Sequence, residues 1–544
     1  MDALDEQSRL IDRVVAMLDT DGSGIMQFET HASRVLVGGG SAYKFKKALR
    51  LPFLDFSTLA ARRRCCEEEC RLNRRLAPDL YLGVTAVTGD PARPGIDGTG
   101  PRLEYAVRMR AFSQQDLWTC RIAQGLLGDA EVDSLALLLA RFHQDAARAP
   151  ACTGWGTVHT VRCGVKATLD ELGRLAPDAS ARATLTGLGN WERQCGAEIG
   201  AMLVRRKGEG RIREGHGDLH CDNLLTESGR VQAFDCIEFS APLRWIDVMD
   251  DLAFIYMDLA FRGRPGLAAR LLNRYLEASG DYGGLAVLRY YRVHRALVRA
   301  KVMLLRSVQP GTAQTTGRDC SSVGLAYLDF ARRCALPGKA ALVITHGCSG
   351  SGKTTLSRLL VESLGAVQLR SDVERKRMHG LPADARITPQ FAAQLYGDAA
   401  THALYSRLVE LARMVAGAGW PVVVDAACLR IWQRSGFREL AASLAIPFFI
   451  VDVRAPPAVM ARRIAARQRQ GTDASDANTA VLACQLSADE ALTEEERGLA
   501  IRVRGGDVLG SAHARIVCRS VLAAVGCQRQ QSGRGEKHDS SGAL

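Results

Sequence analysis

Asp218, Asn223 and Asp235 have the residue types and the order that phosphoryl transfer from ATP requires. Asp218 and Asn223 belong to the sequence HGDLHCDN at 216–223, and Asp235 ends the apolar, strand-like run at 231–234. The reaction needs a carboxylate that accepts the proton of the attacking hydroxyl, and an amide oxygen and a second carboxylate that hold magnesium. This order predicts Asp218 as the base, and Asn223 and Asp235 as the metal ligands. The alternative is a polar loop in which these side chains only form turns, and the complete order disfavours it.

A second phosphate-binding sequence, GCSGSGKT, lies at 347–354 between the apolar run 341–345 and a helical pattern at 356–364. This strand–loop–helix context is the one that a P-loop requires. Its glycines let successive backbone N–H groups surround phosphate oxygens, and the helix N-terminus adds partial positive charge. Lys353 is predicted to reach the β- and γ-phosphates, and Thr354 to bind magnesium. The residues expected at the nucleotide are Gly347, Cys348, Ser349, Gly350, Ser351, Gly352, Lys353, Thr354 and Thr355.

The sequences HGDLHCDN and FDCIEF (234–239) resemble the catalytic and metal-binding segments of the aminoglycoside phosphotransferase-like kinases. With the P-loop behind them, the whole arrangement is similar to bacterial proteins described as bifunctional aminoglycoside phosphotransferase/ATP-binding proteins. The P-loop segment by itself resembles gluconate kinase and shikimate-type kinases. The resemblance implies an α+β, protein-kinase-like bilobal domain at 1–336 and an α/β P-loop kinase domain with a parallel sheet at 339–526. It also implies ATP and Mg²⁺ as cofactors, and the polar tail at 527–544 is predicted to be disordered.

Alternating residues around the glycines at 38–40 predict the first strands of a β-rich lobe, with Lys44 and Lys46 on one face of the third strand. An ATP-binding lobe places one lysine of this strand on the α- and β-phosphates. The count from the hairpin slightly favours Lys46 and leaves Lys44 open, and a basic edge strand is the alternative for either. Kinase-like lobes pair that lysine with a glutamate of the next helix, and Glu69 is the predicted partner. Asp247, in the region that follows the metal aspartate, is expected to anchor the catalytic loop through buried hydrogen bonds.

Four more residues complete the expected P-loop site. The run VVVD at 422–425 predicts a buried strand whose last residue, Asp425, is a metal ligand. Small P-loop kinases place a carboxylate against the acceptor hydroxyl where this chain has Asp372, so Asp372 is the candidate base, with a helix cap as the competing interpretation. Arg463 and Arg467 share a helix face at i, i+4 spacing. Such arginines in P-loop kinases form a lid over the nucleotide, and a solvated basic face is the alternative.

Bulk composition limits the possible classes of protein. The chain has 544 residues, of which 47% are hydrophobic, as in ordinary globular proteins. It lacks an export signal and an apolar run of ~18 residues, so we expect a cytoplasmic location and no membrane partner. Its 16 cysteines are then expected to be free thiols. The net charge of +12 suits anionic ligands, and the missing pattern of basic and aromatic residues disfavours nucleic acid without eliminating it.

These features predict an ATP-dependent phosphotransferase with two nucleotide sites that acts on hydroxyls of small molecules. One alternative is a polynucleotide or tRNA-type kinase that works through the P-loop domain. Another is that one domain senses nucleotide and regulates the other. Neither acceptor can be identified from the sequence, aminoglycosides included, because acceptor pockets have no visible sequence code. The oligomeric state is equally unspecified.

Overall fold

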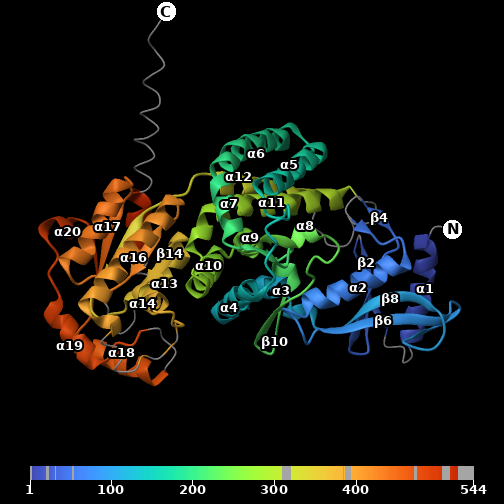
Figure 1. The fold of residues 1–544 in the computed structure, drawn as a ribbon, viewed down its shortest axis with the longest axis horizontal. Helices are drawn as coiled ribbons and strands as arrows, with labels where there is room; N and C mark the ends of the chain where they lie inside the picture. Colours follow the sequence, from blue (N-terminus) through green and yellow to red (C-terminus); the bar gives the residue numbers. More distant parts are fainter. Residues whose placement is uncertain are drawn as a thin grey trace, which may run out of the picture. The chain divides into compact units, whose positions relative to one another are not determined.

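The computed structural model of the chain describes residues 3–19, 24–30, 32–51, 54–308, 320–383, 385, 387, 394–470, 475–504 and 515–524. Residue contacts divide it into two compact units (Figure 1). Unit 1 comprises Met1–Asp258 and Tyr290–Ala331, and unit 2 comprises Leu259–Arg289 and Arg332–Leu544. The expected tail at 527–544 lies outside the described residues. Within the described part of the chain, no helix combines the length and apolar character needed to cross a membrane.

Unit 1 begins with a six-stranded antiparallel sheet in the order β1-β2-β3-β8-β6-β7. Gly39 and Gly40 have φ values of 57° and 71° and form the tight turn from β2 to β3, as the sequence predicts. A short pair of strands, β4 and β5, follows. The strands are β1 (Met26–Glu29), β2 (Ser33–Gly38), β3 (Ser41–Lys46), β4 (Arg50–Leu51), β5 (Leu54–Asp55), β6 (Tyr81–Asp90), β7 (Arg93–Ile96) and β8 (Arg102–Arg110).

Two helices cover opposite faces of this sheet, α1 (Ala3–Leu18) and α2 (Leu59–Asn73). Tyr43 of β3 packs in the cluster that includes Ile11 of α1, whereas the preceding Ala42 packs in the cluster that includes Cys66 of α2. Because side chains alternate along a strand, the even-numbered residues of β3 face α2. The strand therefore directs both candidate lysines toward the helix that carries the candidate glutamate.

The remainder of unit 1 is helical, with two short β-hairpin-like pairs that frame the catalytic segment. Strand β9 (Ile212–Glu214) pairs with β12 (Trp245–Asp247), and β10 (Leu224–Glu227) pairs with β11 (Arg230–Ala233). The α-helices are α3 (Trp118–Ala123), α4 (Asp129–Asp145), α5 (Val158–Leu175), α6 (Ala179–Glu198), α7 (Gly200–Gly208), α8 (Ala241–Arg244), α9 (Val248–Phe261), α11 (Leu285–Ser307) and α12 (Cys320–Ala335), and the 3₁₀ turns are η1 (Gln114–Asp116) and η2 (Cys221–Asn223).

Unit 2 is built on a five-stranded parallel sheet in the order β14-β15-β13-β16-β17. Apolar strand residues such as Val343 and Val423 pack against Leu356 and Leu360 of α13. The strands are β13 (Leu342–His346), β14 (Val367–Arg370), β15 (Val422–Asp425), β16 (Phe448–Arg454) and β17 (Ala500–Arg504). The helices include α13 (Lys353–Leu364), α14 (Ser371–Met378), α16 (Asp398–Gly417), α17 (Ile431–Ser443), α18 (Pro457–Gln470), α19 (Thr479–Ala488) and α20 (Glu494–Gly498). The α+β kinase-like class and the α/β P-loop class expected from the sequence are confirmed.

Helix α10 (Pro265–Ser279) and the turn η3 (Tyr282–Gly284) belong to unit 2, although they precede the expected domain boundary at 337–338. The side chain of Asn273 on α10 donates to the carbonyl oxygen of Ala366 (2.8 Å) and accepts the N–H of Gln368 (2.6 Å). These bonds satisfy the backbone of β14, an edge strand of the parallel sheet. The compact unit that holds the P-loop therefore includes a segment from the earlier part of the chain.

Candidate active sites

The expected catalytic loop of unit 1 runs from β9 to β10, and buried charged groups fix its backbone. The carboxylate of Asp251 on α9 accepts the N–H groups of His216 (2.6 Å) and Gly217 (2.8 Å). Arg295 on α11 donates to the carbonyl oxygen of Gly217 (2.9 Å). Gly217 has φ 85°, and a Cβ there would lie 2.7 Å from the carbonyl oxygen of Leu243, so the turn requires glycine.

Asp247 does not anchor this loop, and the expectation that it would is wrong. Its two carboxylate oxygens accept 2.7 Å hydrogen bonds from Arg206 on α7, and one of them also accepts the N–H of Met249 (2.9 Å). Asp247 ends β12, whereas Asp251 lies on the first turns of α9, where its side chain reaches the loop. The loop anchor is therefore four residues further along the chain.

Asp218 lies within hydrogen-bond distance of two side chains from the same loop. His220 Nε2 is 3.2 Å from Asp218 Oδ2, and Asn223 Nδ2 donates to the same oxygen at 3.0 Å. Burial acts to raise the pKa of Asp218, but the charge of His220 and its hydrogen bond hold that pKa well below its ordinary value. Burial opposes the charge on His220 as well, yet Asp218 raises the pKa of His220 to about 9. Both shifts favour the charged forms of Asp218 and His220, although the Arg299 guanidinium, 3.2 Å from the same His220 Nε2, opposes protonation of the imidazole.

Lys44 and Lys46 both reach Glu69 of α2, and their other partners differ. Lys44 Nζ lies 2.8 Å from Glu69 Oε1 and also contacts Asp235, the expected metal ligand. Lys46 Nζ contacts Glu69 and lies 2.5 Å from Glu238 Oε1, in a site where the Lys46 side chain is 2% exposed. Burial tends to raise the pKa of Glu69, but the charges of Lys44 and Lys46 lower it to about 2. The geometry thus places Lys44 beside Asp235, the expected metal ligand, and Lys46 in a buried ion pair.

Asp235 and Asn223 offer oxygen atoms that suit magnesium. Asp235 follows β11 with φ 64°, a left-handed conformation that costs a non-glycine residue about 1 kcal/mol or more and is typical of functional sites. Its side chain is 42% exposed, so the carboxylate is accessible. Asn223 uses Nδ2 to bind Asp218, which leaves its Oδ1 as a further oxygen donor. Mg²⁺ prefers such carboxylate and amide oxygens together with phosphate oxygens, so these residues fit the ion.

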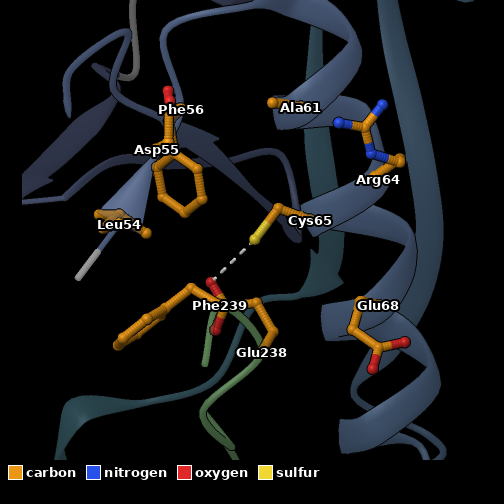
Figure 2. Close-up of a pocket in the computed structure, with 9 residues that line it drawn as sticks. All are labelled: Leu54, Asp55, Phe56, Ala61, Arg64, Cys65, Glu68, Glu238 and Phe239. Atoms are coloured by element: carbon orange, nitrogen blue, oxygen red, sulfur yellow. Dashed lines mark hydrogen bonds between the residues drawn. The ribbon is translucent and has the colours of Figure 1, made fainter. Parts of the chain in front are cut away.

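A pocket of about 290 Å³ lies beside Glu238 in unit 1, between α2 and the segment of Glu238 and Phe239 (Figure 2). Cys65 Sγ and Glu238 Oε1 point toward each other in it at 3.5 Å, and Phe56 and Phe239 form apolar parts of the lining. None of its lining residues is an expected nucleotide or metal contact. Because Glu238 is the partner of Lys46, the pocket adjoins the buried ion pair.

The P-loop of unit 2 has the backbone that its glycines make possible. Gly347, Gly350 and Gly352 have φ values of 137°, 79° and 107°. A Cβ would lie 2.4 Å from the carbonyl oxygen of Val453 at Gly347 and 2.6 Å from that of Met460 at Gly350. Lys353, whose pKa burial lowers, donates from Nζ to the carbonyl oxygen of Cys348 at 2.8 Å. The lysine is thus held across the loop, with Thr355 exposed on the first turn of α13.

Asp425, an expected metal ligand, ends β15, and the expected ligand Thr354 lies near it. Thr354 interacts with the Asp425 carboxylate, and Gln368 Nε2 donates to Asp425 Oδ2 at 3.0 Å. Burial raises the pKa of Asp425, against the charges of nearby Arg370 and Lys353. Asp372, half-buried at the start of α14, interacts electrostatically with both Lys353 and Asp425. A hydroxyl and a carboxylate fit magnesium here, with a second carboxylate close by.

Arg463 and Arg467 differ in what they contact. Arg463 Nη1 donates to the P-loop carbonyl oxygens of Gly350 (3.2 Å) and Ser351 (3.1 Å). Arg467 Nη2 donates to the carbonyl oxygen of Ala477 at 3.5 Å, in the segment before α19. The structure therefore brings Arg463 to the phosphate-binding loop, whereas Arg467 braces the chain that follows α18.

Several residues around these sites escaped the sequence reasoning. Asp251 had a local signal, since it belongs to an acidic pair at the start of a helix, but Arg295 and Gln485 stand in ordinary helical sequence. Arg370 of β14 pairs with Glu277 of α10 at 2.7 Å and lies 3.9 Å from Asp425. The partners of Arg295, Gln485 and Arg370 are Gly217, Ser349 and Asp425, and each partner is more than 50 positions away in the sequence. Their roles become visible only with the tertiary contacts.

Comparisons with other proteins cover both halves of the chain. The uncharacterized protein Rv2004c of Mycobacterium tuberculosis is 31% identical over 474 residues, which is 87% of this chain and 91% of the relative. The uncharacterized protein Mb2027c of Mycobacterium bovis matches to the same extent. A family described as an AAA domain matches residues 342–492.

Solved structures resemble parts of the chain. A choline/ethanolamine kinase family protein from Mesorhizobium loti is 13% identical, covers 60% of this chain and 98% of its own, and has a TM-score of 0.36. A gluconokinase from Sinorhizobium meliloti 1021 is 20% identical and covers 36% of this chain and 98% of its own, with a TM-score of 0.24. The Mycobacterium tuberculosis APS kinase CysC is 24% identical and covers 34% and 99%, with a TM-score of 0.26. At these identities and TM-scores, the likenesses carry no information on substrates.

Proposed function

We propose that this chain, which belongs to one family with the mycobacterial proteins Rv2004c and Mb2027c, is an ATP-dependent phosphotransferase with two separate nucleotide sites. Each site would transfer the γ-phosphoryl group of ATP to a hydroxyl of a small molecule. The observation that supports the proposal is that each unit contains a lysine, oxygen atoms of the kind that bind magnesium, and a carboxylate that could act as base. In unit 1 these come from β3, from the loop around Asn223 and from Asp218, and in unit 2 from the P-loop, β15 and α14.

In unit 1, Lys44 is the residue that we assign to the α- and β-phosphates. Its amine is held by Glu69 and faces Asp235, which with Asn223 would hold magnesium. Magnesium would neutralise charge on the phosphates when bound. Asp218 accepts a hydrogen bond from the acceptor hydroxyl and orients its oxygen toward the γ-phosphorus. The bond from the γ-phosphorus to the β–γ bridging oxygen breaks as the bond to the acceptor oxygen forms, and ADP leaves. Because the pKa of Asp218 is low, the carboxylate takes the proton late, once the new P–O bond has made the hydroxyl acidic.

In unit 2, the P-loop N–H groups and Lys353 would bind the β- and γ-phosphates, and Thr354 and Asp425 would hold magnesium. Arg463 would then stand beside the phosphates, because its guanidinium already touches the loop at Gly350. We assign Asp372 to the acceptor hydroxyl because its charge interacts with that of Lys353, the residue assigned to the β- and γ-phosphates. The acceptor of each unit is left open.

The test is a panel of hydroxyl compounds incubated with ATP labelled in the γ-phosphate and the full chain. Asp218→Asn should abolish one set of labelled products, and Lys353→Ala should abolish another. Each change should leave the other set within about twofold, because each site has its own base and its own lysine. Loss of both sets in either folded variant would support instead a domain that senses nucleotide for its neighbour. Absence of labelled product with every acceptor and variant would refute the proposal.

A further inference from the structure

The peptide bond between Cys348 and Ser349 in the P-loop is held from both ends. Its carbonyl oxygen accepts a hydrogen bond from Lys353 Nζ at 2.8 Å. Its N–H donates to Oε1 of Gln485 at 2.7 Å, and Gln485 lies on α19. Since the C=O and N–H of a trans peptide point in opposite directions, Gln485 sits on the side of the loop away from the lysine amine. A side chain outside the phosphate-binding face thus fixes the group that holds Lys353.

Other contacts join α18 and α19 to the same stretch of the P-loop. The Cys348 side chain is buried in a cluster with Ile464 of α18 and Leu482 of α19. Just after α19, Asp489 Oδ1 lies 3.2 Å from Nε2 of His346, the residue that ends β13 before the loop. With Arg463 on the carbonyl oxygens of Gly350 and Ser351, α18 and α19 contact the loop at residues 348–351, and Asp489 contacts His346 before it. The position of α19 is therefore linked to the conformation of the loop.

The peptide between Cys348 and Ser349 can turn only through ψ of Cys348 and φ of Ser349, the torsions on either side of it. The hydrogen bonds at its two ends therefore hold its C=O and N–H in their present directions. A turned peptide would direct its N–H, another donor, toward the Lys353 ammonium in place of the carbonyl oxygen. Lys353 would then lose its acceptor and the position from which it can reach the phosphates. An acceptor on the outer side of the loop prevents this rotation.

We propose that Gln485 is a positioning residue of the second site, which acts on bound nucleotide through the Cys348–Ser349 peptide and Lys353. The inference rests on the proposed function of unit 2, because it concerns how Lys353 meets the β- and γ-phosphates. Helix α19 would then fix the position of the Lys353 amine, in addition to packing against the loop. The effect of Gln485 on nucleotide binding must then depend on the presence of Lys353.

A double-mutant cycle on the full chain tests this dependence. All proteins carry Asp235→Ala so that binding of a fluorescent ATP analogue reports the second site, and titrations extend into the millimolar range. Gln485→Met keeps the length of the side chain and removes the acceptor, so loss of one hydrogen bond should weaken binding roughly tenfold. In a Lys353→Ala background the same change should alter binding by less than about twofold. Leu486→Ala, at an exposed residue of the same helix, is the matched control and should leave binding unchanged.

Equal losses in the two backgrounds would overturn the inference, because they would mean that Gln485 acts without Lys353. Unchanged binding in Gln485→Met with Lys353 present would also overturn it. Gln485→Glu retains an acceptor oxygen, so this second variant should bind the ATP analogue better than Gln485→Met. Gln468→Glu, on an exposed face of α18, measures the effect of the added negative charge alone. If the Asp235→Ala parent bound no ATP analogue, the proposed function of unit 2 would fail, and the inference with it.

Discussion

Replacing Lys44 and Lys46 one at a time by methionine separates the phosphate-binding lysine from the structural one. Lys46 has its partners inside the fold, since its side chain is 2% exposed and that of Glu238 is 5% exposed. Lys46→Met would leave Glu238 charged, buried and without its close partner. Removing one member of a buried pair typically lowers the free energy of unfolding by about 3–5 kcal/mol. That is a large share of the roughly 5–15 kcal/mol by which a domain is stable.

Lys44→Met should have the opposite profile. Asp235, with a side chain 42% exposed, can be hydrated when Lys44 is lost, and Glu69 keeps its contact with Lys46. Glu69 Oε1 is buried and loses its bond from Lys44, so we expect a loss of roughly 1–3 kcal/mol of stability, less than for Lys46→Met. Removal of a preorganised donor to a developing charge slows catalysis by about 10²- to 10³-fold. Lys44→Met should thus be folded and nearly inactive in the first transfer reaction.

Both variants are best made in a Lys353→Ala background, so that ATP binding and transfer report unit 1. Urea unfolding measures stability, and titration with magnesium–ATP measures binding. Burial raises the pKa of Glu238, so protonation of this carboxyl should partly relieve the Lys46→Met defect as the pH falls. If Lys46→Met abolished ATP binding without loss of stability while Lys44→Met bound normally, the assignment of the two lysines would be reversed.

Three further changes probe other parts of the structure. The pKa of His220 is about 9 in the fold against about 6.5 when unfolded, so its stabilising effect should be complete below pH ~6.5 and vanish as the pH rises through ~9. In urea unfolding between pH 6 and 10, the free energy of unfolding should decline with pH, and His220→Gln should flatten this decline. Parallel pH curves for the two proteins would contradict the prediction. Asp251→Asn should reduce the free energy of unfolding by about 2 kcal/mol and slow only the first transfer reaction; an unchanged rate would show that the loop needs no anchor. A protease site inserted between Pro337 and Gly338 should give fragments that co-elute in gel filtration, because α10 packs in unit 2; fragments that separate in native buffer would refute this packing.

The sequence alone determined the two phosphate-handling motifs and the class of each fold. Both motifs are local, since their function depends on residue type and backbone conformation over about eight consecutive positions. Gly347 and Gly350 must be glycine because of φ and close backbone neighbours, and Asn223 lies in the same short loop as Asp218. The residue types of each motif are contained in the segment itself, so the motif can be identified without knowledge of the rest of the chain.

Tertiary structure decided which of two equivalent residues occupies each position. Lys44 and Lys46 lie on one face of β3 because strand side chains alternate, and only the placement of Asp235 and Glu238 tells them apart. Asp251, and not Asp247, bonds to the expected catalytic loop, because α9 begins at Val248 and carries the Asp251 carboxylate to His216 and Gly217. Packing of distant elements, which sets these distances, leaves no periodic or local pattern in sequence.

The membership of α10 in unit 2 and the contact of Gln485 with the P-loop have the same physical origin. Asn273 of α10 hydrogen-bonds the edge strand β14, about 90 residues later in the chain. Gln485 meets Ser349 across a sequence separation of 136 residues. A single amide side chain suffices for either contact, and an amide on a helix has no distinctive sequence signature. The motifs therefore predicted where phosphate would bind, whereas the fold alone determined which side chains hold those motifs in place.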